Sequence, residues 1–364
     1  MGNIISQLSR TLRKEIGINT SISGRDATPH HPKFDARAQE AYSIASGLKS
    51  YAGGMKVRIS AASKFIASLV IVCLCLSAGI AAGKEKNIED VIAGLVNKIP
   101  QRQKNAKTGS EFSACIASVP PSQREEAIEL EVTEGNFPEF LKRLKPIRMT
   151  HRFHDGTTKT ATIFAMPDYL SVGSDGDYLL TPMALSSAVD TAMKLGFMLP
   201  TRKIVDAIFG QSDIRCVPQP LPAGPEMRST AYYVKHDRKI KTQLLAMACA
   251  PGALVSGHKK DVVLSNRLIR SQGKIAIYGW HRLSGIPIQP LSTVHGAKYA
   301  DYSHGIRLIS DTVLIDGEPQ SMTDLLENPK FADIVSDEGP MPGLRRFMNS
   351  HHTLSVDTAP LSLR

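Results

Sequence analysis

The sequence predicts an α+β fold, in which an N-terminal helical segment precedes a mostly antiparallel sheet with flanking helices. Apolar residues recur at three- and four-residue spacing soon after residue 87, and short strand-like runs cluster beyond residue 230. Helices followed by clustered strands are typical of α+β proteins rather than doubly wound ones. With 42% hydrophobic residues in a chain of 364, there is enough apolar side chain to form a core, which excludes a disordered protein.

Residues 55–83 have the three parts of a secretory signal. Basic residues follow Met55, and the run 65–83 contains no charged residue. Small residues at the end of this run offer cleavage positions, so the mature chain would begin near Lys84, and we expect a secreted or periplasmic protein. The alternative is an uncleaved membrane anchor with the C-terminal domain outside the cell, because about 19 apolar residues can cross a bilayer. We expect no other contact with a membrane.

Residues 1–54 precede this signal, although secretory signals normally begin at the initiator methionine. We interpret them as a disordered extension or as a mis-assigned start, with Met55 as the true one. A rival interpretation is N-myristoylation at Gly2, because the first six residues match that pattern.

The distribution of charge argues against nucleic acid as a partner. The formal net charge is +10, but residues 1–83 hold ten basic and four acidic residues, which leaves a net charge of +4 on residues 84–364. That charge is too dilute for a surface that follows a phosphate backbone. Nucleotide-dependent catalysis is also disfavoured, because the sequence lacks a Walker A motif and a G-x-G-x-x-G after a strand.

Residues 84–150 are expected to form the helical segment, with breaks at prolines. Its apolar positions and its breaks are Ile88, Val91, Ile92, Leu95, Ile99, Pro100, Pro120, Pro121 and Pro138.

Residues 151–348 are expected to form the α+β domain that carries the site, and residues 349–364 a flexible tail. A helix is predicted from Thr181, a capping residue followed by proline, to Gly196. Another short helix is predicted to begin at Pro200-Thr201 and to end at Gly210. Alternation and composition predict strands. Their ranges are 158–165, 231–235, 253–256, 261–265, 274–278, 306–309 and 313–315.

The mature part of the chain holds three cysteines, Cys115, Cys216 and Cys249. This sparse, odd number fits no disulfide framework, although one bridge is permitted in an oxidising compartment. The fold must therefore be stabilised by its core.

Four of the eleven histidines and the only tryptophan fall between residues 258 and 304. Polar groups at strand ends and in glycine-containing loops are the usual construction of an active site on a rigid sheet. We therefore expect residues 253–310 to form one sheet, whose loops converge on a single pocket that holds His281, Asp301 and His304. Of these, His304 is the residue that we expect to carry the chemistry, from a position that faces solvent.

The segments Pro167–Leu170 and Leu199–Lys203, together with this histidine-containing part, resemble an uncharacterised family of secreted bacterial proteins. The resemblance covers roughly residues 108–310. Because the family has no assigned activity, the resemblance implies an exported bacterial protein and adds nothing on mechanism.

Zinc chemistry is the first of two chemistries that fit the histidines. Two histidines and a carboxylate can bind zinc with one position open, and the metal then provides a hydroxide near neutral pH. His295, Asp301 and His304 are the nearest set in the sequence. Their spacing is only loosely like the His-Asp-His ligands of zinc peptidases that cut peptidoglycan cross-links, and an H-E-x-x-H motif is missing.

The second chemistry needs no metal. His304 or His281 would act as general base, oriented by Asp301 or Asp261, with Ser303 or a water as the nucleophile. Cationic, amide and aromatic side chains nearby would bind the substrate. They are Lys260, Trp280, Gln289, Tyr302 and Arg307.

We therefore expect an exported hydrolase that acts on a cell-envelope polymer, either peptidoglycan peptide or glycan. Hydrolysis by water is the reaction class that an exported chain without nucleotides or reducing power can perform most readily. The alternative is a protein that binds a cell-envelope polymer without turnover.

Overall fold

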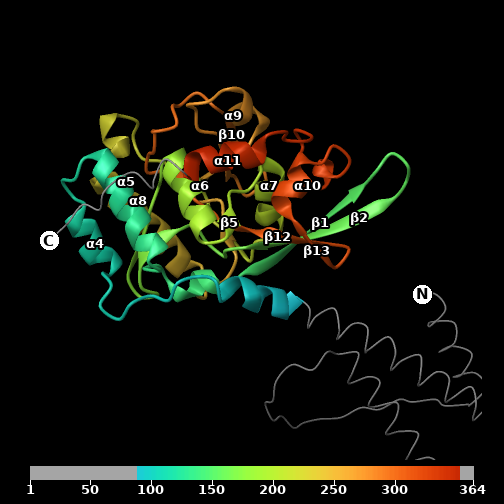
Figure 1. Ribbon diagram of the computed structural model, residues 1–364. Helices are drawn as coiled ribbons and strands as arrows, with labels where there is room; N and C mark the ends of the chain where they lie inside the picture. Colours follow the sequence, from blue (N-terminus) through green and yellow to red (C-terminus); the bar gives the residue numbers. More distant parts are fainter. Residues whose placement is uncertain (1–87, 353–364) are drawn as a thin grey trace, which may run out of the picture. The chain divides into compact units, whose positions relative to one another are not determined.

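The computed structural model of the chain describes residues 88–352 (Figure 1). The predicted extension 1–54, the predicted signal or anchor at 55–83 and the alternative of acylation at Gly2 lie outside these residues. The fold is α+β, as the sequence predicted, with helices around sheets whose strand pairs are mostly antiparallel.

The N-terminal part of the described residues is helical, with proline and capping residues at the starts of its helices. A helix over residues 88–96 is followed by α4 (Gly109–Cys115), α5 (Pro121–Thr133) and the 3-10 helix η1 (Glu139–Lys142). Thr108 and Glu111 form a capping box at α4. The apolar side chains of α4 and α5 belong to the same core as those of the sheet that follows, so these helices form part of the main body.

A five-stranded antiparallel sheet forms the first large part of the core. Its order is β1 (Lys145–Arg152), β2 (Thr158–Ala165), β12 (Ile309–Ile315) and β13 (Glu318–Ser321), and β5 (Phe197–Met198) also pairs with β12. Strand β1 begins inside the range 84–150 that we expected to be helical. Its alternating burial, with Ile147 and Met149 inside, explains why these residues form a strand.

A four-stranded sheet carries most of the predicted site. Its order is β10 (Pro287–Ser292), β9 (Ile277–His281), β8 (Lys260–Val262) and β11 (His304–Gly305). Strands β8 and β11 pair in parallel, and the other pairs are antiparallel. The expectation of a single sheet over residues 253–310 was therefore wrong in part, because β7 (Val255–Ser256) pairs with β6 (Ile214–Arg215) instead, and β12 belongs to the five-stranded sheet. The remaining pair joins β3 (Ser171–Gly173) to β4 (Tyr178–Leu180).

Two of the predicted helices are present, with one shifted start. Helix α7 (Arg202–Gln211) begins where it was predicted, and the hydroxyl of Thr201 caps it. Helix α6 (Leu185–Lys194) begins after Ala184, later than the Thr181 start that we predicted. Helix α6 packs against α5 and against α11 (Leu344–His352). Residues 349–352, which we expected to belong to the flexible tail, are therefore part of helix α11. The helices α9 (Asn266–Arg270) and α10 (Met322–Glu327) and the 3-10 helix η3 (Ala332–Ile334) complete this part.

The strand predicted at 231–235 is wrong, because these residues lie in helix α8 (Thr230–Ala246). This helix follows the 3-10 helix η2 (Pro225–Arg228), and the hydroxyl of Ser229 caps it. Tyr233, His236, Asp237 and Ile240 are buried at helical spacing, so burial along one face outweighs the strand preference of the local Tyr-Tyr-Val run.

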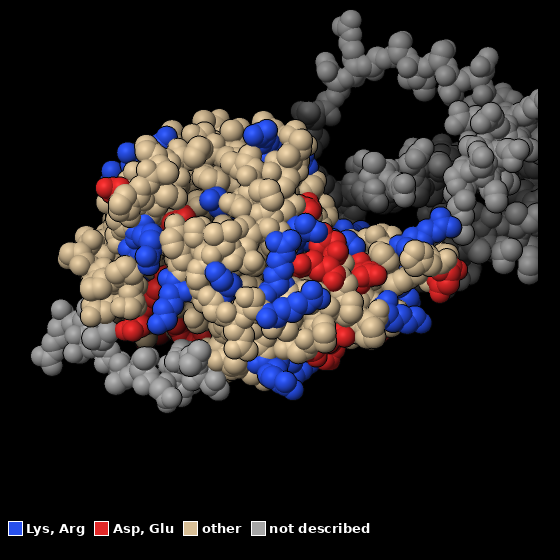
Figure 2. Space-filling view, turned by 90° about the horizontal axis from the view of Figure 1, so that it is seen from above, with Lys and Arg blue, Asp and Glu red and all other residues tan. Residues whose placement is uncertain are grey.

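Within residues 88–352 the three cysteines are free, and Cys216 alone among them is fully buried. No helix in that range is long and apolar enough to cross a membrane. Figure 2 shows that lysines and arginines on one face lie in small groups beside aspartates and glutamates.

Candidate functional site

The candidate site lies at the parallel pair of strands β8 and β11. His304 is opposite Lys260 in the register, and Gly305 is opposite Asp261. A turn precedes β11, in which the main-chain N–H of His304 donates to the carbonyl of Asp301 at 3.1 Å. The chain thereby returns on itself and places the side chains of Asp301 and His304 near each other.

Glycine is required at position 305 by its neighbours. A Cβ atom there would lie 2.6 Å from Cδ1 of Tyr169 and 2.7 Å from Cβ of Lys259. The groups that approach Gly305 most closely are therefore two buried side chains of the protein itself.

The imidazole of His304 has an unusual environment. Its Nε2 lies 3.9 Å from Oδ2 of Asp301, which is too long for a hydrogen bond, and neither ring nitrogen has a hydrogen-bond partner among the described residues. Asp301 is well bonded, since it accepts from the main-chain N–H and the hydroxyl of Ser303 at 2.8 and 2.5 Å and from the hydroxyl of Tyr299 at 3.1 Å. The Ser303 hydroxyl is thus bonded to Asp301, so the structure does not place it as a nucleophile activated by His304.

Burial, hydrogen bonds and neighbouring charges together determine the protonation of Asp301 and His304. His304 is 0% exposed, contrary to the solvent-facing position that we expected, and burial lowers its pKa to about 4 although Asp301 opposes the shift. Burial also opposes ionisation of Asp301, but the neighbouring imidazole and the two hydrogen bonds from Ser303 outweigh it and hold the pKa of Asp301 below its usual value. Near neutral pH the site therefore consists of a neutral imidazole beside a carboxylate.

Lys260 and Trp280 lie next to this pair. The Lys260 ammonium is 5.1 Å from the centroid of the Trp280 ring. Lys260 is partly exposed, whereas Trp280, Asp301 and His304 are buried. Burial lowers the pKa of Lys260. Trp280 has a φ angle of 54°, a left-handed conformation that is uncommon for a large side chain and that clusters at functional sites.

Tyr302 and the adjacent Lys259 are structural members of the site. The Tyr302 hydroxyl donates to the carbonyl of Leu221 and accepts from its N–H, which anchors the proline-rich segment 218–225. The fully buried Lys259 ammonium donates to the carbonyl of Tyr302 at 2.6 Å, and burial lowers the pKa of Lys259 to about 8. The ring of Tyr302 is buried as well, so it is not placed to stack on a substrate.

Asp261 and Arg307 form a separate buried cluster with Tyr169. The Tyr169 hydroxyl donates to Asp261 at 2.9 Å, and the Arg307 guanidinium lies over the Tyr169 ring at 4.2 Å. The guanidinium also donates to the carbonyls of Met166 and Val255, at 3.0 and 2.6 Å. Its donors are used inside the protein, so Arg307 stabilises the core and is not available to an anionic substrate.

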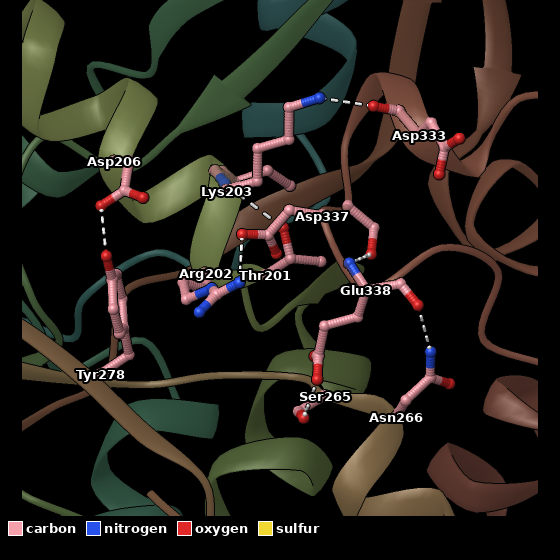
Figure 3. A network of polar contacts seen from close by, with 12 residues as sticks. Thr201, Arg202, Lys203, Asp206, Ser265, Asn266, Tyr278, Asp333, Asp337 and Glu338 are labelled. Carbon is pink, nitrogen blue, oxygen red and sulfur yellow. Dashed lines mark hydrogen bonds and ion pairs between the residues drawn. The ribbon is translucent and has the colours of Figure 1, made fainter. Parts of the chain in front are cut away.

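His281 has a partner outside the predicted pocket. Its Nε2 lies 2.8 Å from Oδ1 of Asp206 in α7, and its ring stacks on Phe209 with centroids 4.6 Å apart. The Tyr278 hydroxyl donates to the same Asp206 oxygen at 2.8 Å, as Figure 3 shows. The structure therefore gives His281 a role in joining α7 to the four-stranded sheet, and none of its hydrogen bonds or ring contacts reaches Asp301 or His304.

Figure 3 also shows how the segment 199–203 is used. Thr201 and Lys203 donate to main-chain carbonyls of the segment 333–337, and Arg202 pairs with Asp337 there. Glu338, the residue directly after this segment, accepts a hydrogen bond from the hydroxyl of Ser265. This polar network fixes the N-terminus of α7 and the chain after β8, so the segment that carries part of the family resemblance has a structural function.

The predicted zinc ligands do not form a metal site. The imidazole of His295 stacks on the ring of Tyr299 at 4.0 Å, and the other predicted histidine, His304, contacts the same ring edge-on at 5.7 Å. Within residues 88–352 no group of three or more His, Cys, Asp or Glu side chains is arranged to hold a metal ion. The expectation of zinc at His295, Asp301 and His304 is therefore not kept.

Gln289 lies away from these groups. It is on β10, opposite Gly279, and its side-chain amide donates to the neighbouring carbonyl of Pro290 at 2.9 Å. Nothing in its contacts supports the predicted part in substrate binding.

Sequence reasoning missed three residues that the structure places at or beside the site. Tyr299 orients Asp301, Lys259 supports Tyr302, and Asp206 holds His281. Position in the sequence could have indicated Tyr299 and Lys259, which are close to predicted residues. No sequence signal connects Asp206 with a strand more than 70 residues further on.

Comparisons with known proteins were made for the whole chain. No family model matches it, and neither a curated protein nor a solved structure matches it significantly. The resemblance to secreted bacterial proteins therefore stays a prediction.

Proposed function

We propose that the protein is an exported hydrolase of a cell-envelope polymer, with His304 as general base and Asp301 as the neighbouring carboxylate that compensates the charge of its protonated form. One observation carries the proposal: a fully buried, neutral imidazole has no hydrogen-bond partner at either nitrogen among the described residues, although a carboxylate lies 3.9 Å away. Buried polar groups without partners are rare, and a catalytic role is one of the recognised reasons for them. The compartment follows from the uncharged run 65–83.

The chemistry follows from the protonation of the pair. For a peptide substrate, His304 takes a proton from a water molecule as the water oxygen bonds to the carbonyl carbon. The imidazolium then gives this proton to the leaving amine as the C–N bond breaks. Asp301 is ionised throughout and compensates the positive charge of the imidazolium, and the bonds from Ser303 and Tyr299 hold its carboxylate in place.

The alternative function is binding of a cell-envelope polymer without turnover. The complete burial of His304 and Asp301 favours this alternative, since the residues beside them that are partly exposed are Lys260 and Tyr299.

Digestion of peptidoglycan sacculi by the purified full chain separates the two functions. We expect wild type to release soluble fragments and His304→Ala to release none, while both variants still sediment with sacculi. The control is His154→Ala, because His154 is exposed in the β1–β2 turn, away from strands β8 and β11. Wild type that sediments with sacculi but releases nothing would support binding alone. Undiminished release by His304→Ala would refute the role of His304.

A further inference from the structure

A cavity of about 600 Å³ lies beside α5, outside the groups described above. It is lined by residues of α5, by the start of α6, by η2, by the loop before β11 and by α11. The volume is typical of a pocket for a small molecule or a short peptide. Its charged lining residues are three cations, three carboxylates and one histidine: Arg124, Arg228, Lys298, Glu125, Glu126, Glu129 and His351.

The cavity has three cationic side chains from three different parts of the chain, Arg124, Arg228 and Lys298. None of them forms an ion pair among the described residues. Arg124 is 3% exposed, and its guanidinium donates to the hydroxyls of Thr230 and Tyr233, while its Nε has no partner. The guanidinium thus donates only to neutral groups, and its charge is compensated only in part by the adjacent Glu125, which favours an anion nearby.

The carboxylates of the cavity cancel only part of this positive charge. Glu129 is paired with Lys194 at 2.8 Å. Glu125 accepts a hydrogen bond from the main-chain N–H of Ala184 at 2.8 Å, and burial raises the pKa of Glu125 to about 7 against the pull of Arg124. A large fraction of Glu125 is therefore protonated near neutral pH, when it can donate a hydrogen bond to an anion.

We infer that this cavity binds the free carboxylate of a short peptide. Arg228 and Lys298 are exposed at its rim and would contact the carboxylate, and Arg124 would attract it from inside. The remaining carboxylates of the cavity, Glu126 and Glu129, would repel a polyanion and attract the free amino group of the same peptide. The volume also exceeds what an inorganic anion would fill. That this peptide is part of the polymer substrate rests on the proposed function, whereas the binding itself does not.

The cavity lies next to the segment that carries the candidate site. Ala300, which lines it, directly precedes Asp301 in the chain. The Arg228 guanidinium lies 5.3 Å from the centroid of the Tyr299 ring, and the Tyr299 hydroxyl is bonded to Asp301. A peptide whose carboxylate is bound at Arg228 would therefore lie near the residue that holds Asp301.

Calorimetric titration of the full chain with trialanine and with trialanine amide tests the inference, because the two peptides differ only in the carboxylate. We expect the amide to bind at least tenfold more weakly than the acid. Arg228→Gln and Lys298→Gln should each weaken binding of the acid by about tenfold, the equivalent of one lost charge contact. The matched control is Arg282→Gln, in the exposed turn between β9 and β10, which should bind as wild type does.

Three results would overturn the inference: no binding of trialanine, equal binding of acid and amide, or binding of inorganic phosphate as tight as that of trialanine, which would indicate a simple anion site. Sacculus digestion distinguishes this failure from failure of the proposed function. Trialanine binding without release of fragments would support the peptide-binding cavity and reject the hydrolase. Release of fragments without trialanine binding would support the hydrolase and reject the peptide-binding cavity.

Discussion

The protonation of His304 can be tested through the pH dependence of stability. The unfolded chain protonates this imidazole near pH 6.5, whereas burial holds its pKa in the folded protein at about 4. Between these values the unfolded state binds one more proton than the folded state, so the stability is complete above pH 6.5 and falls as the pH falls. The loss from this one residue amounts to about 3 kcal/mol at pH 4.

Urea unfolding of wild type and of His304→Gln, measured at intervals from pH 7.5 to pH 4, isolates this effect. Other groups, such as His236, whose pKa burial lowers to about 2, also destabilise the fold at low pH, but they contribute to both proteins. We expect the free energy of unfolding of wild type to fall more steeply than that of the variant, with a difference that grows to about 3 kcal/mol. Parallel curves would mean that His304 titrates normally in the folded protein, and the neutral buried base would have to be abandoned.

Three further predictions concern the same region. Gly305→Ala should lower the free energy of unfolding by roughly 1–3 kcal/mol in chemical denaturation, because its Cβ would overlap Tyr169 and Lys259; unchanged stability would contradict this close packing. Thr201→Ala should cost about 1 kcal/mol through loss of the α7 cap, visible as a lower Tm, and a Tm equal to that of wild type would argue against the cap. Asp301→Asn should reduce fragment release from sacculi by at least tenfold while binding to sacculi persists, and wild-type release would remove Asp301 from the mechanism.

Elements with a local signal were predictable from the sequence. Thr201 precedes α7 because its hydroxyl accepts from the free main-chain N–H of Ile204. The alternation of Ala161, Ile163 and Ala165 predicted β2 correctly, although the residues between them are buried as well. The strand at 231–235 failed because its outcome depends on what packs against it: the buried stripe through Tyr233 and Ile240 is set by contacts distant in the sequence.

The candidate site was predictable only where its members are close in the chain. Asp301 and His304 are three residues apart, and one turn is enough to bring them together. His281 was grouped with them by proximity in the sequence, but its partner Asp206 belongs to a helix that precedes it by 75 residues. Composition also could not show that His304 would be sealed from solvent, because burial depends on how helices and sheets far apart in the sequence pack together.

The position of Trp280 gives the protein a built-in optical reporter. It is the only tryptophan in the chain, it is 5% exposed, and an ammonium group lies 5.1 Å from its ring centroid. Intrinsic tryptophan fluorescence therefore arises from one place, next to Lys260 and Tyr302. A change in the charge or hydration of that neighbourhood will alter the emission without any attached dye, so events there can be followed in the unmodified protein.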